Sequence, residues 1–439
     1  MNEPKLIGEL GELGVHDPSI FIDNGMYYVF STDAGPGHSL GVQIRRSHDL
    51  VSWEHIGVAF QDFSSDCLEA IEYSRLNPDR MQGLWAPDIM KVGDEYRLYF
   101  AASTLGSSRS CICLATSRNA GGPYDYKGIV LKSDSSENST AESPESKFPN
   151  AIDPSFATGE DGKLYMAYGS FFGGIFIAEV DRETGFLAEP RNPKRIAGAP
   201  GAAVEGAYIL HIPESGFYYL FVSYGALSSN YNIRLGRAKS PLGPYLDAKG
   251  NDMAFGSPGG NDSIGTKLMG GFTLKSSGMS VKAPGHNSAI VDGGNYFIAH
   301  HGRSYSLPGY QFFLNIRQFW LNSHGWPVAA PSRYHNDPKA LDSLPDGVYD
   351  LVEHLADSNK ESHDSKRFLL CSGKLSSLES HGISGELSFV RENRIELRIF
   401  GNSYDGVAVT QYDWSKGIDV PAFTAMSEDG LCVWGIKAY

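Results

Sequence analysis

The stretch that decides the fold is His16-Asp17-Pro18-Ser19-Ile20, which runs through a glycine-containing turn into Tyr27-Tyr28-Val29-Phe30. The same succession of a short polar motif, a turn and an aromatic strand recurs four more times. The later motifs are Trp85-Ala86-Pro87-Asp88-Ile89, Ile152-Asp153-Pro154-Ser155-Phe156, Val204-Glu205-Gly206-Ala207-Tyr208 and Gly285-His286-Asn287-Ser288-Ala289. A repeat of roughly 40–50 residues or more, with four short strands per unit, is typical of β-propellers. The repeat therefore predicts an all-β fold that contains a five-bladed propeller.

Each unit continues with two further strands. The third strands are expected at residues 41–44, 111–114, 174–177, 231–234 and 313–316, and the fourth strands near Trp53, Tyr124, Phe186, Tyr245 and Trp326. Residues 133–149 are rich in Ser, Glu and Pro, and residues 248–283 are rich in Gly and Ser. Loops of this length are functional or disordered, so these two insertions either line the substrate site of the propeller or are disordered.

A second domain follows the propeller pattern, which ends around Pro331-Ser332-Arg333-Tyr334. Beyond it, short alternating strands such as residues 394–400 predict a separate β-barrel or sandwich. A chain of 439 residues is also long for one hydrophobic core. We therefore predict a propeller over residues 1–335 and a C-terminal β-domain over residues 340–439.

The composition limits the partners. A formal net charge of −14 argues against nucleic acid or an anionic membrane, because both need a basic face. No apolar run of about 18 residues is present, so no membrane span is expected. The five cysteines are expected to be reduced thiols, since Cys111 and Cys113 share one strand face and are poorly placed to pair. We expect a monomer that binds a neutral or weakly charged substrate.

The first residues, Met1-Asn2-Glu3-Pro4-Lys5, contain no apolar signal segment. Such a start fits a cytoplasmic enzyme, and it equally fits a secreted enzyme whose signal has been removed. Both locations stay open at the level of sequence.

Asp17, Asp153 and Glu205 are the candidate catalytic residues. An isolated Asp beside Pro is most often a turn acid. Here, however, the acids hold matching places in separate repeats, and such places converge on a propeller's axis. Buried like charges are costly without a task, so their convergence points to function. Asp88 follows its Pro, whereas Asp17 and Asp153 precede theirs; it is either a turn cap or a sugar contact, and we leave it out of the catalytic set.

Two facing carboxyl groups are what glycoside hydrolysis requires. One donates a proton to the leaving oxygen, and the other activates water or attacks carbon. A third acid can hold the proton donor in place and raise its pKa by repulsion between like charges.

The five motifs together resemble family 43 of the glycoside hydrolases. Residues 168–175, 231–234 and 322–328 are similar to the endo-α-1,5-L-arabinanase branch, and residues 422–435 resemble the extra β-domain of two-domain arabinanases. The resemblance implies hydrolysis with inversion, in which Asp17 is the general base, Glu205 the general acid, and Asp153 the residue that positions Glu205. In an inverting enzyme the carboxyl groups of base and acid lie about 6.5–9.5 Å apart.

The resemblance also implies a metal. Related arabinanases carry a histidine at the place of His301 that helps to hold one central ion, usually calcium, with waters in the other positions. The neighbouring His300 leaves the register ambiguous by one residue, and Arg303 favours His301 through a His-x-Arg pattern. The alternative is that His301 binds no metal and only forms hydrogen bonds within the protein, since calcium prefers oxygen ligands.

Six residues are predicted to contact the substrate or the metal's waters. They are Trp85, Ile152, Ser170, Phe172, His286 and Asn287. Core packing for Trp85, and hydrogen bonding within the turn for His286 and Asn287, are the alternatives. Two departures from the family pattern, Leu105 in place of an aromatic residue and Phe172 in place of Trp, reduce the flat surface available to a sugar ring.

The resulting functional hypothesis is an enzyme that cleaves α-1,5-linked L-arabinofuranosyl chains of arabinan, with an endo mode. One alternative is an exo-acting α-L-arabinofuranosidase or β-xylosidase on the same propeller. A second is a non-catalytic carbohydrate-binding propeller, which would have no need of a spaced acid and base.

Overall fold

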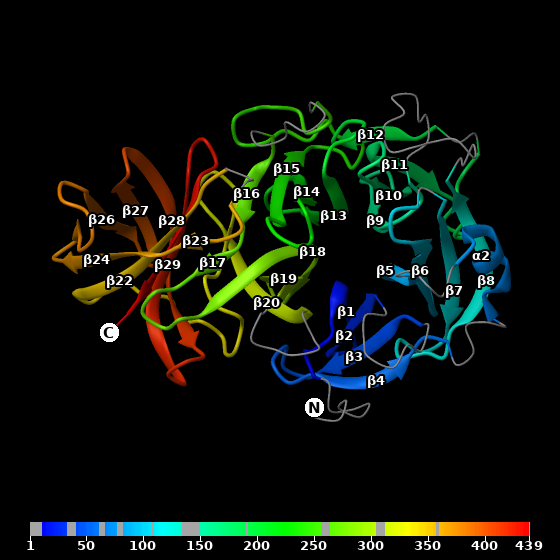
Figure 1. Ribbon diagram of the computed structural model, residues 1–439, viewed down its shortest axis with the longest axis horizontal. Coiled ribbons are helices and arrows are strands. Elements are labelled where there is room, and N and C mark those ends of the chain that lie inside the picture. Colours follow the sequence, from blue (N-terminus) through cyan, green and yellow to red (C-terminus); the bar gives the residue numbers. More distant parts are fainter. Residues whose placement is uncertain are drawn as a thin grey trace.

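The structure is a computed structural model that describes most of the chain. The described residues are 11–32, 41–60, 66–76, 82–107, 109–133, 150–189, 192–255, 264–303, 312–356 and 360–438. Five sheets are arranged in a ring, and a closed barrel of eight strands lies beside the ring (Figure 1). The prediction of a five-bladed propeller followed by a small β-barrel or sandwich is confirmed, and the second domain is a barrel.

Each blade is an antiparallel sheet whose strands follow the order of the chain. Blade 1 contains β1 (His16–Asp23), β2 (Met26–Thr32), β3 (Gln43–Ser47) and β4 (Glu54–Val58). Blade 2 contains β5 (Gln82–Val92), β6 (Glu95–Thr104), β7 (Cys111–Ser117) and β8 (Asp125–Lys132). Blade 3 contains β9 (Ser155–Thr158), β10 (Leu164–Ser170), β11 (Gly174–Val180) and β12 (Lys194–Ala197).

Blades 4 and 5 complete the ring. Blade 4 contains β13 (Val204–Ile212), β14 (Phe217–Tyr224), β15 (Asn232–Ala238) and β16 (Thr266–Met269). Blade 5 contains β18 (Ser280–Asp292), β19 (Asn295–Arg303), β20 (Phe312–Leu321) and β21 (Pro327–Ala329), and β17 (Phe272–Thr273) extends its inner edge. The second strands of blades 2, 3 and 4 are buried along almost their whole length, because both of their faces are covered.

The ring closes between the N-terminal segment and blade 5. Leu13 forms an antiparallel bridge with Phe313, and Leu314 N–H donates to the Glu12 carbonyl (2.8 Å). Nearer the axis, Ser288 Oγ donates to the Pro18 carbonyl (2.7 Å) and accepts from Ile20 N–H (2.8 Å). Blade 1 is thus joined to blade 5 along both its edge and its inner strand.

Two of the predicted outer strands were wrong. The outer strands of blades 3 and 4 are β12 and β16, which come later than the predicted positions near Phe186 and Tyr245. Leu187 and Leu246 lie instead in isolated bridges with Val180 and Arg237. The segment 248–283 was expected to be an insertion, but it supplies β16 and β17, because its apolar residues fall in two short clusters rather than one alternating run. Of the segment 133–149, residues 134–149 lie outside the described residues.

Helical structure is sparse in the described part of the chain. Helix α2 (Leu68–Ser74) packs against β6, β7 and β8 of blade 2. No helix in the described ranges is long and apolar enough to cross a membrane. All five cysteines are free thiols, as predicted.

The C-terminal barrel closes on itself with eight antiparallel strands. They are β22 (Gly347–His354), β24 (Lys366–Cys371), β25 (Lys374–Ser377), β26 (Ser384–Arg391), β27 (Arg394–Ile399), β28 (Asn402–Asp413), β29 (Ile418–Ser427) and β30 (Cys432–Lys437). Alternate residues of these strands fill the interior, as in β27, where Ile395, Leu397 and Ile399 are buried and their neighbours face outward.

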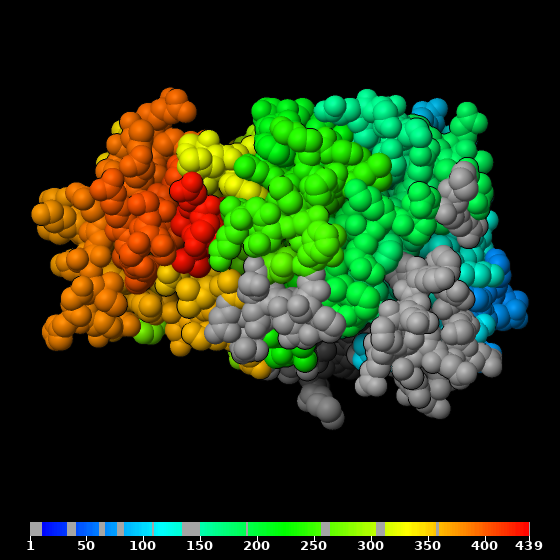
Figure 2. Space-filling view, turned by 90° about the horizontal axis from the view of Figure 1, so that it is seen from above, coloured from blue at the N-terminus to red at the C-terminus, as the bar shows by residue number. Residues whose placement is uncertain are grey.

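The barrel is docked on blades 4 and 5 (Figure 2). A two-residue strand, β23 (His363–Asp364), leaves the barrel and pairs in parallel with β17. Trp434 of β30 is fully buried in a cluster with residues of both domains and stands edge-on to Phe272, with ring centroids 5.2 Å apart. The interface therefore combines main-chain pairing with an apolar core.

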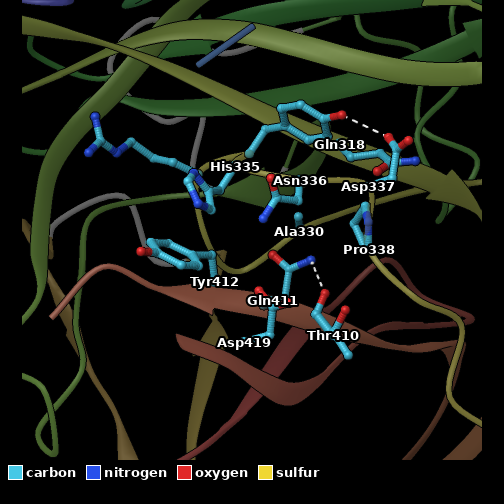
Figure 3. A pocket seen from close by; sticks show the side chains of 12 residues that line it. Gln318, Ala330, His335, Asn336, Asp337, Pro338, Thr410, Gln411, Tyr412 and Asp419 are labelled. Atoms are coloured by element: carbon cyan, nitrogen blue, oxygen red, sulfur yellow. Dashed lines mark hydrogen bonds between the residues drawn. The ribbon is translucent and has the colours of Figure 1, made fainter. Parts of the chain in front are cut away.

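A small polar hollow lies at the junction of the two domains (Figure 3). Its walls come from the segment 330–338 and from β28, and Gln411, Tyr412 and His335 point into it. Many of its polar atoms are already paired; Tyr334 Oη, for example, donates to Asp337 (2.7 Å), and Gln411 Nε2 donates to the Thr410 carbonyl (2.9 Å). None of the predicted catalytic residues lines it.

Candidate active site

The five repeated motifs all contain a residue in the left-handed backbone region. These residues are Asp17 (φ 50°), Ala86 (φ 42°), Asp153 (φ 55°), Gly206 (φ 62°) and His286 (φ 45°). For a non-glycine residue this conformation costs about 1–2 kcal/mol, and such strain concentrates at functional sites. In four of the blades the strand pairing also shifts at this point, which marks a β-bulge. The bulge turns the motif side chains out of the ladder toward the axis.

The bulges change the register that the sequence predicted. Glu205 stands one residue before the left-handed position of its blade, and Asp88 stands two residues after it. Asp88 pairs across its sheet with Tyr99 as Ser19 pairs with Phe30, so Asp88 is equivalent to Ser19 rather than to Asp17. The prediction that Asp17, Asp153 and Glu205 hold matching places is therefore correct for Asp17 and Asp153 and offset by one residue for Glu205, and the uncertain register of Asp88 is resolved as that of Ser19.

Asp17 is buried and held at both oxygens. Thr32 Oγ1 donates to Oδ2 (2.6 Å), and His16 Nδ1 lies 2.7 Å from the same oxygen. On the other side, His286 Nδ1 lies 2.9 Å from Oδ1. Burial alone would raise the pKa of Asp17, but the imidazoles of His16 and His286 outweigh it and hold the pKa well below its usual range. Asp17 is thus a carboxylate at neutral pH.

Glu205 is shifted in the opposite direction. Burial, and next the negative charge of Asp153, raise the pKa of Glu205 to about 8, so this carboxyl group carries a proton at neutral pH. Its Oε1 atom accepts a hydrogen bond from Tyr231 Oη (2.8 Å). A protonated acid therefore shares the site with the ionised Asp17, an arrangement that suits acid and base catalysis.

Asp153 joins these two groups. Burial raises its pKa to about 6, with the positive His286 opposing the shift and Asp17 adding to it. Its Oδ2 atom accepts a hydrogen bond from Gly206 N–H (3.0 Å), which fixes Asp153 against the residue that follows Glu205. The three predicted catalytic residues are thus brought into one electrostatically coupled cluster.

His286 supplies the positive charge of this cluster. Burial would lower its pKa, but Asp17 and Asp153 outweigh burial and raise the pKa to about 9. Its main-chain N–H donates to Ser223 Oγ (2.7 Å) in blade 4. Gly206 lies against the ring, since a Cβ atom there would stand 3.1 Å from His286 Cγ. His286 therefore balances the acids and ties blade 5 to blade 4.

His301 lies beside Asp17 and is fully buried. Its Nδ1 atom accepts a hydrogen bond from Asp17 N–H (3.2 Å), and its Nε2 atom has no partner among the described residues. His16 Nε2 is likewise buried and unpartnered in the described part of the chain. His16, Asp17 and His301 each offer a ligand atom, and these atoms lie within 4.8 Å of one another.

The neighbouring His300 has a different task. Arg317 Nε–H donates to His300 Nε2 (3.1 Å), and an arginine side chain has no acceptor atom. The ring proton of His300 is therefore on Nδ1, which donates to the His301 carbonyl (2.8 Å). Burial, and then Arg317, lower the pKa of His300 to about 3. His300 is a neutral link that holds the main chain at His301, so it has no lone pair left for a metal.

Asp88 joins three blades through its two carboxylate oxygens. Oδ1 accepts from Ser19 Oγ (2.7 Å) in blade 1, and Oδ2 accepts from Phe156 N–H (3.0 Å) in blade 3. Burial raises the pKa of Asp88 to about 7, although these hydrogen bonds oppose the shift. Of the two interpretations that the sequence left open, a turn cap or a sugar contact, neither describes this role between blades.

The predicted substrate-contacting residues differ in exposure. Trp85 and Phe172 are partly exposed, Trp85 next to the left-handed Ala86 and Phe172 in the turn between β10 and β11. Ile152 and Ser170 are buried beside Asp153 in blade 3. Asn287 is also buried, and both polar atoms of its side chain lack a partner in the described structure. Leu105 is 60% exposed after β6, at the same end of blade 2 as Trp85.

Three residues of the site received no role from the sequence. His16 contacts Asp17, Thr32 joins Asp17 Oδ2 to Ala86 N–H of blade 2 (2.8 Å), and Tyr231 contacts Glu205. His16 and Tyr231 stand inside motifs that the sequence makes visible, so their positions offered a signal. Thr32 stands at the end of an aromatic strand, where the sequence pattern gives no signal of a functional role.

Comparisons with known proteins agree with this geometry. The family model for glycosyl hydrolases family 43 matches residues 11–327, and the model for a C-terminal lipocalin-like domain matches residues 331–435. An extracellular endo-α-(1→5)-L-arabinanase of Thermotoga petrophila is 35% identical over 96% of this chain and 93% of its own length. Extracellular endo-α-(1→5)-L-arabinanase 2 of Bacillus subtilis is 33% identical over 97% of this chain and 93% of its own.

A solved structure is similar over both domains. The family 43 glycoside hydrolase of Bacillus licheniformis superposes with a TM-score of 0.86 at 35% identity, and the match covers 98% of this chain and 99% of that one. The match over nearly the full length decides the assignment: this chain belongs to family 43 of the glycosyl hydrolases.

Proposed function

We propose that this protein hydrolyses α-1,5-linked L-arabinofuranosyl chains within arabinan, with inversion at the anomeric carbon. The observation that carries the proposal is the pair of carboxyl groups with opposite protonation, Asp17 ionised and Glu205 protonated. The two relatives above carry the name endo-α-(1→5)-L-arabinanase and match along nearly the whole chain.

In this mechanism a single displacement breaks the glycosidic bond. Glu205 gives its proton to the leaving oxygen as the C1–O bond breaks. Asp17 takes a proton from the water that forms the new bond to C1. Asp153 holds Gly206 and, by its negative charge, keeps the proton on Glu205 until the bond breaks.

The first experiment is a product profile on debranched linear arabinan. A ladder of short oligosaccharides is expected, and the first product should carry the inverted anomeric configuration by ¹H NMR. Arabinose alone from the start would replace the endo mode with an exo mode. Cleavage of xylan but not arabinan would contradict the proposed substrate. Cleavage of neither would contradict the proposal that the protein is a glycosidase.

The variant Glu205→Gln tests the acid. We expect kcat on arabinan to fall by about 10²–10⁴-fold, because general acid catalysis typically contributes that much. Glu214→Gln changes an exposed acid in the turn after β13 and serves as the control, with wild-type kcat expected. Wild-type turnover by Glu205→Gln would exclude Glu205 as the acid.

We also propose that His301 holds one calcium ion, largely coordinated by water. The support is the buried, unpartnered Nε2 atom and its closeness to His16 and Asp17. Calcium prefers oxygen ligands, so waters would complete the shell. Binding through Nε2 requires the ring proton on Nδ1, and it therefore competes with the hydrogen bond from Asp17 N–H. The bound ion would supply positive charge on the propeller axis.

Calorimetric titration of chelator-treated protein with calcium tests this site. One binding event per chain is expected for the wild type and none for His301→Ala. Binding that survives in His301→Ala would place the ion elsewhere, and the absence of binding in the wild type would contradict the calcium proposal.

Two broader properties complete the proposal. The relatives named extracellular favour secretion over a cytoplasmic location, which fractionation of the producing cells would test. A monomer is proposed because the net charge of −14 opposes self-association, and light scattering should give a mass near 47.8 kDa.

A further inference from the structure

Three aromatic rings lie in a parallel stack beside the catalytic acids. His16 and His301 are 4.5 Å apart between ring centroids with planes at 9°, and His301 and Tyr231 are 5.7 Å apart at 7°. Phe312 stands edge-on to both histidines, at 4.4 Å and 5.4 Å. We call His16, His301 and Tyr231 the ring stack.

The two ends of the ring stack contact the two catalytic residues. At one end His16 Nδ1 lies 2.7 Å from Asp17 Oδ2, and at the other Tyr231 Oη donates to Glu205 Oε1 (2.8 Å). His301 stands between them and accepts a hydrogen bond from Asp17 N–H. The ring stack therefore runs from the base to the acid.

The position of Tyr231 is fixed by packing. The ring is 1% exposed and lies against Gly285, where a Cβ atom would stand 2.1 Å from Tyr231 Cδ1. Gly285 is itself paired across the sheet with His301. The ring can therefore neither rotate nor move away from Glu205 without displacing blade 5.

We propose that Tyr231 is the positioning residue for the general acid and that the ring stack fixes the acid relative to the base. This inference rests on the proposed glycosidase function. Since Tyr231 donates to Oε1, the acidic proton of Glu205 sits on Oε2 and faces the leaving oxygen. As that proton moves to the leaving oxygen and the C1–O bond breaks, Oε1 gains negative charge and the hydrogen bond from Tyr231 strengthens.

The variant Tyr231→Phe keeps the ring and deletes only the hydroxyl. We expect kcat on linear arabinan to fall by about 10–100-fold, with KM within about twofold, because the lost bond is made to a group that becomes charged. On 2,4-dinitrophenyl α-L-arabinotrioside, whose leaving group needs no proton, the fall should be less than about threefold. The ratio of the two rates does not depend on how much of the variant folds.

The control is Tyr219→Phe in the same blade. Its buried hydroxyl donates to the Gly325 carbonyl (2.5 Å) away from the catalytic residues, so both substrates should be cleaved at wild-type rates. Tyr231→Leu removes the ring as well and should slow both substrates, since His301 loses its stacking partner.

Two outcomes would overturn the inference. An effect below twofold for Tyr231→Phe on arabinan would show that the hydroxyl does not serve the acid. An equal loss on both substrates would show a merely structural role. Cleavage of neither substrate by the wild type would instead overturn the proposed function, so the two failures are distinguishable.

Discussion

Asp17, Asp153 and Glu205 are chemically similar carboxyl groups, yet their surroundings drive their pKa values apart. The imidazoles of His16 and His286 lie within 2.9 Å of the Asp17 carboxylate oxygens and lower its pKa, whereas burial and like charge raise the pKa of Glu205. The acid and the base are therefore assigned by the neighbours of each side chain and not by its chemical type.

The charge of Asp153 should appear in the pH profile. Asp153→Asn removes the repulsion that helps to hold the pKa of Glu205 at about 8. Glu205 acts in its protonated form, so activity is lost as the pH rises through that pKa. We expect the basic limb of kcat/KM to move down by about one pH unit, with kcat also reduced. Asp161→Asn, an exposed acid in the same blade, should leave the limb in place, and an unmoved limb in Asp153→Asn would contradict this coupling.

The buried Asp88 should make stability depend on pH. Burial raises its pKa in the folded chain to about 7, from 3.8 when exposed. Between these values the unfolded chain releases a proton that the folded chain keeps, so the stability due to this group is present below pH 3.8 and is lost as the pH rises toward 7.

Asp88→Asn mimics the protonated group and removes that dependence. Compared with the wild type, the variant should gain in melting temperature at pH 8 and show little gain at pH 4. Wild-type kcat per folded molecule is expected, since the hydrogen bonds of Asp88 go to Ser19 and Phe156 and not to Asp17, Asp153 or Glu205. A gain that is equal at both pH values would contradict the raised pKa.

At the scale of elements, the inner strand of each blade shares one device. A left-handed residue, accompanied in four blades by a bulge, interrupts the regular pairing of this strand. Asp17, Asp153 and His286 are themselves the left-handed residues and Glu205 directly precedes one, whereas side chains two residues beyond, such as Asp88 and Ser288, join neighbouring blades. One strand thus serves catalysis at one end and blade packing at the other.

A substitution at Gly285 tests how closely β18 packs against the Tyr231 ring of blade 4. Gly285→Ala places a methyl group on the Tyr231 ring, so the ring or β18 must shift. We expect a loss of about 1–3 kcal/mol in stability and at least a tenfold fall in kcat. The control is Gly293→Ala in the turn after β18, where the added methyl group contacts no other atom. Only the left-handed backbone (φ 55°) should make this substitution destabilising. Unchanged kcat in Gly285→Ala would show that the site tolerates movement of Tyr231.

At the scale of the whole molecule, the barrel and the propeller share one apolar cluster. Trp434 of the barrel packs on Phe272, His354 and the guanidinium of Arg317, which in turn holds His300. The junction also contains main-chain pairing between β17 and β23. The two domains should therefore unfold together.

Trp434→Leu should weaken this junction. Removing most of a fully buried indole is expected to cost about 3–5 kcal/mol, and calorimetry should show a lower melting temperature. Trp414→Leu, at a barrel position that is 37% exposed, is the matched control and should change stability by less than about 1 kcal/mol. Equal effects of the two substitutions would contradict a buried interface at Trp434.

The sequence by itself determined the number of blades and the following β-domain, and it singled out the three acids that the fold brings together. Propeller repeats are local, so each blade displays its own motif and aromatic strand along the chain. The outer strands β12 and β16 escaped prediction because they are short and follow long connections. The role of Asp88 also escaped, because its neighbours belong to blades 1 and 3.

Only the tertiary structure decided the protonation of the site and the partners of the catalytic residues. Thr32 donates a hydrogen bond to Asp17 from the end of β2, and Tyr231 donates one to Glu205 from the residue before β15, so both contacts depend on how the strands pair. A pKa depends on burial and on charges that arrive from other blades, as His286 of blade 5 does at Asp17 of blade 1. The chain encodes which groups are present, and the closed ring determines which of them carries the proton.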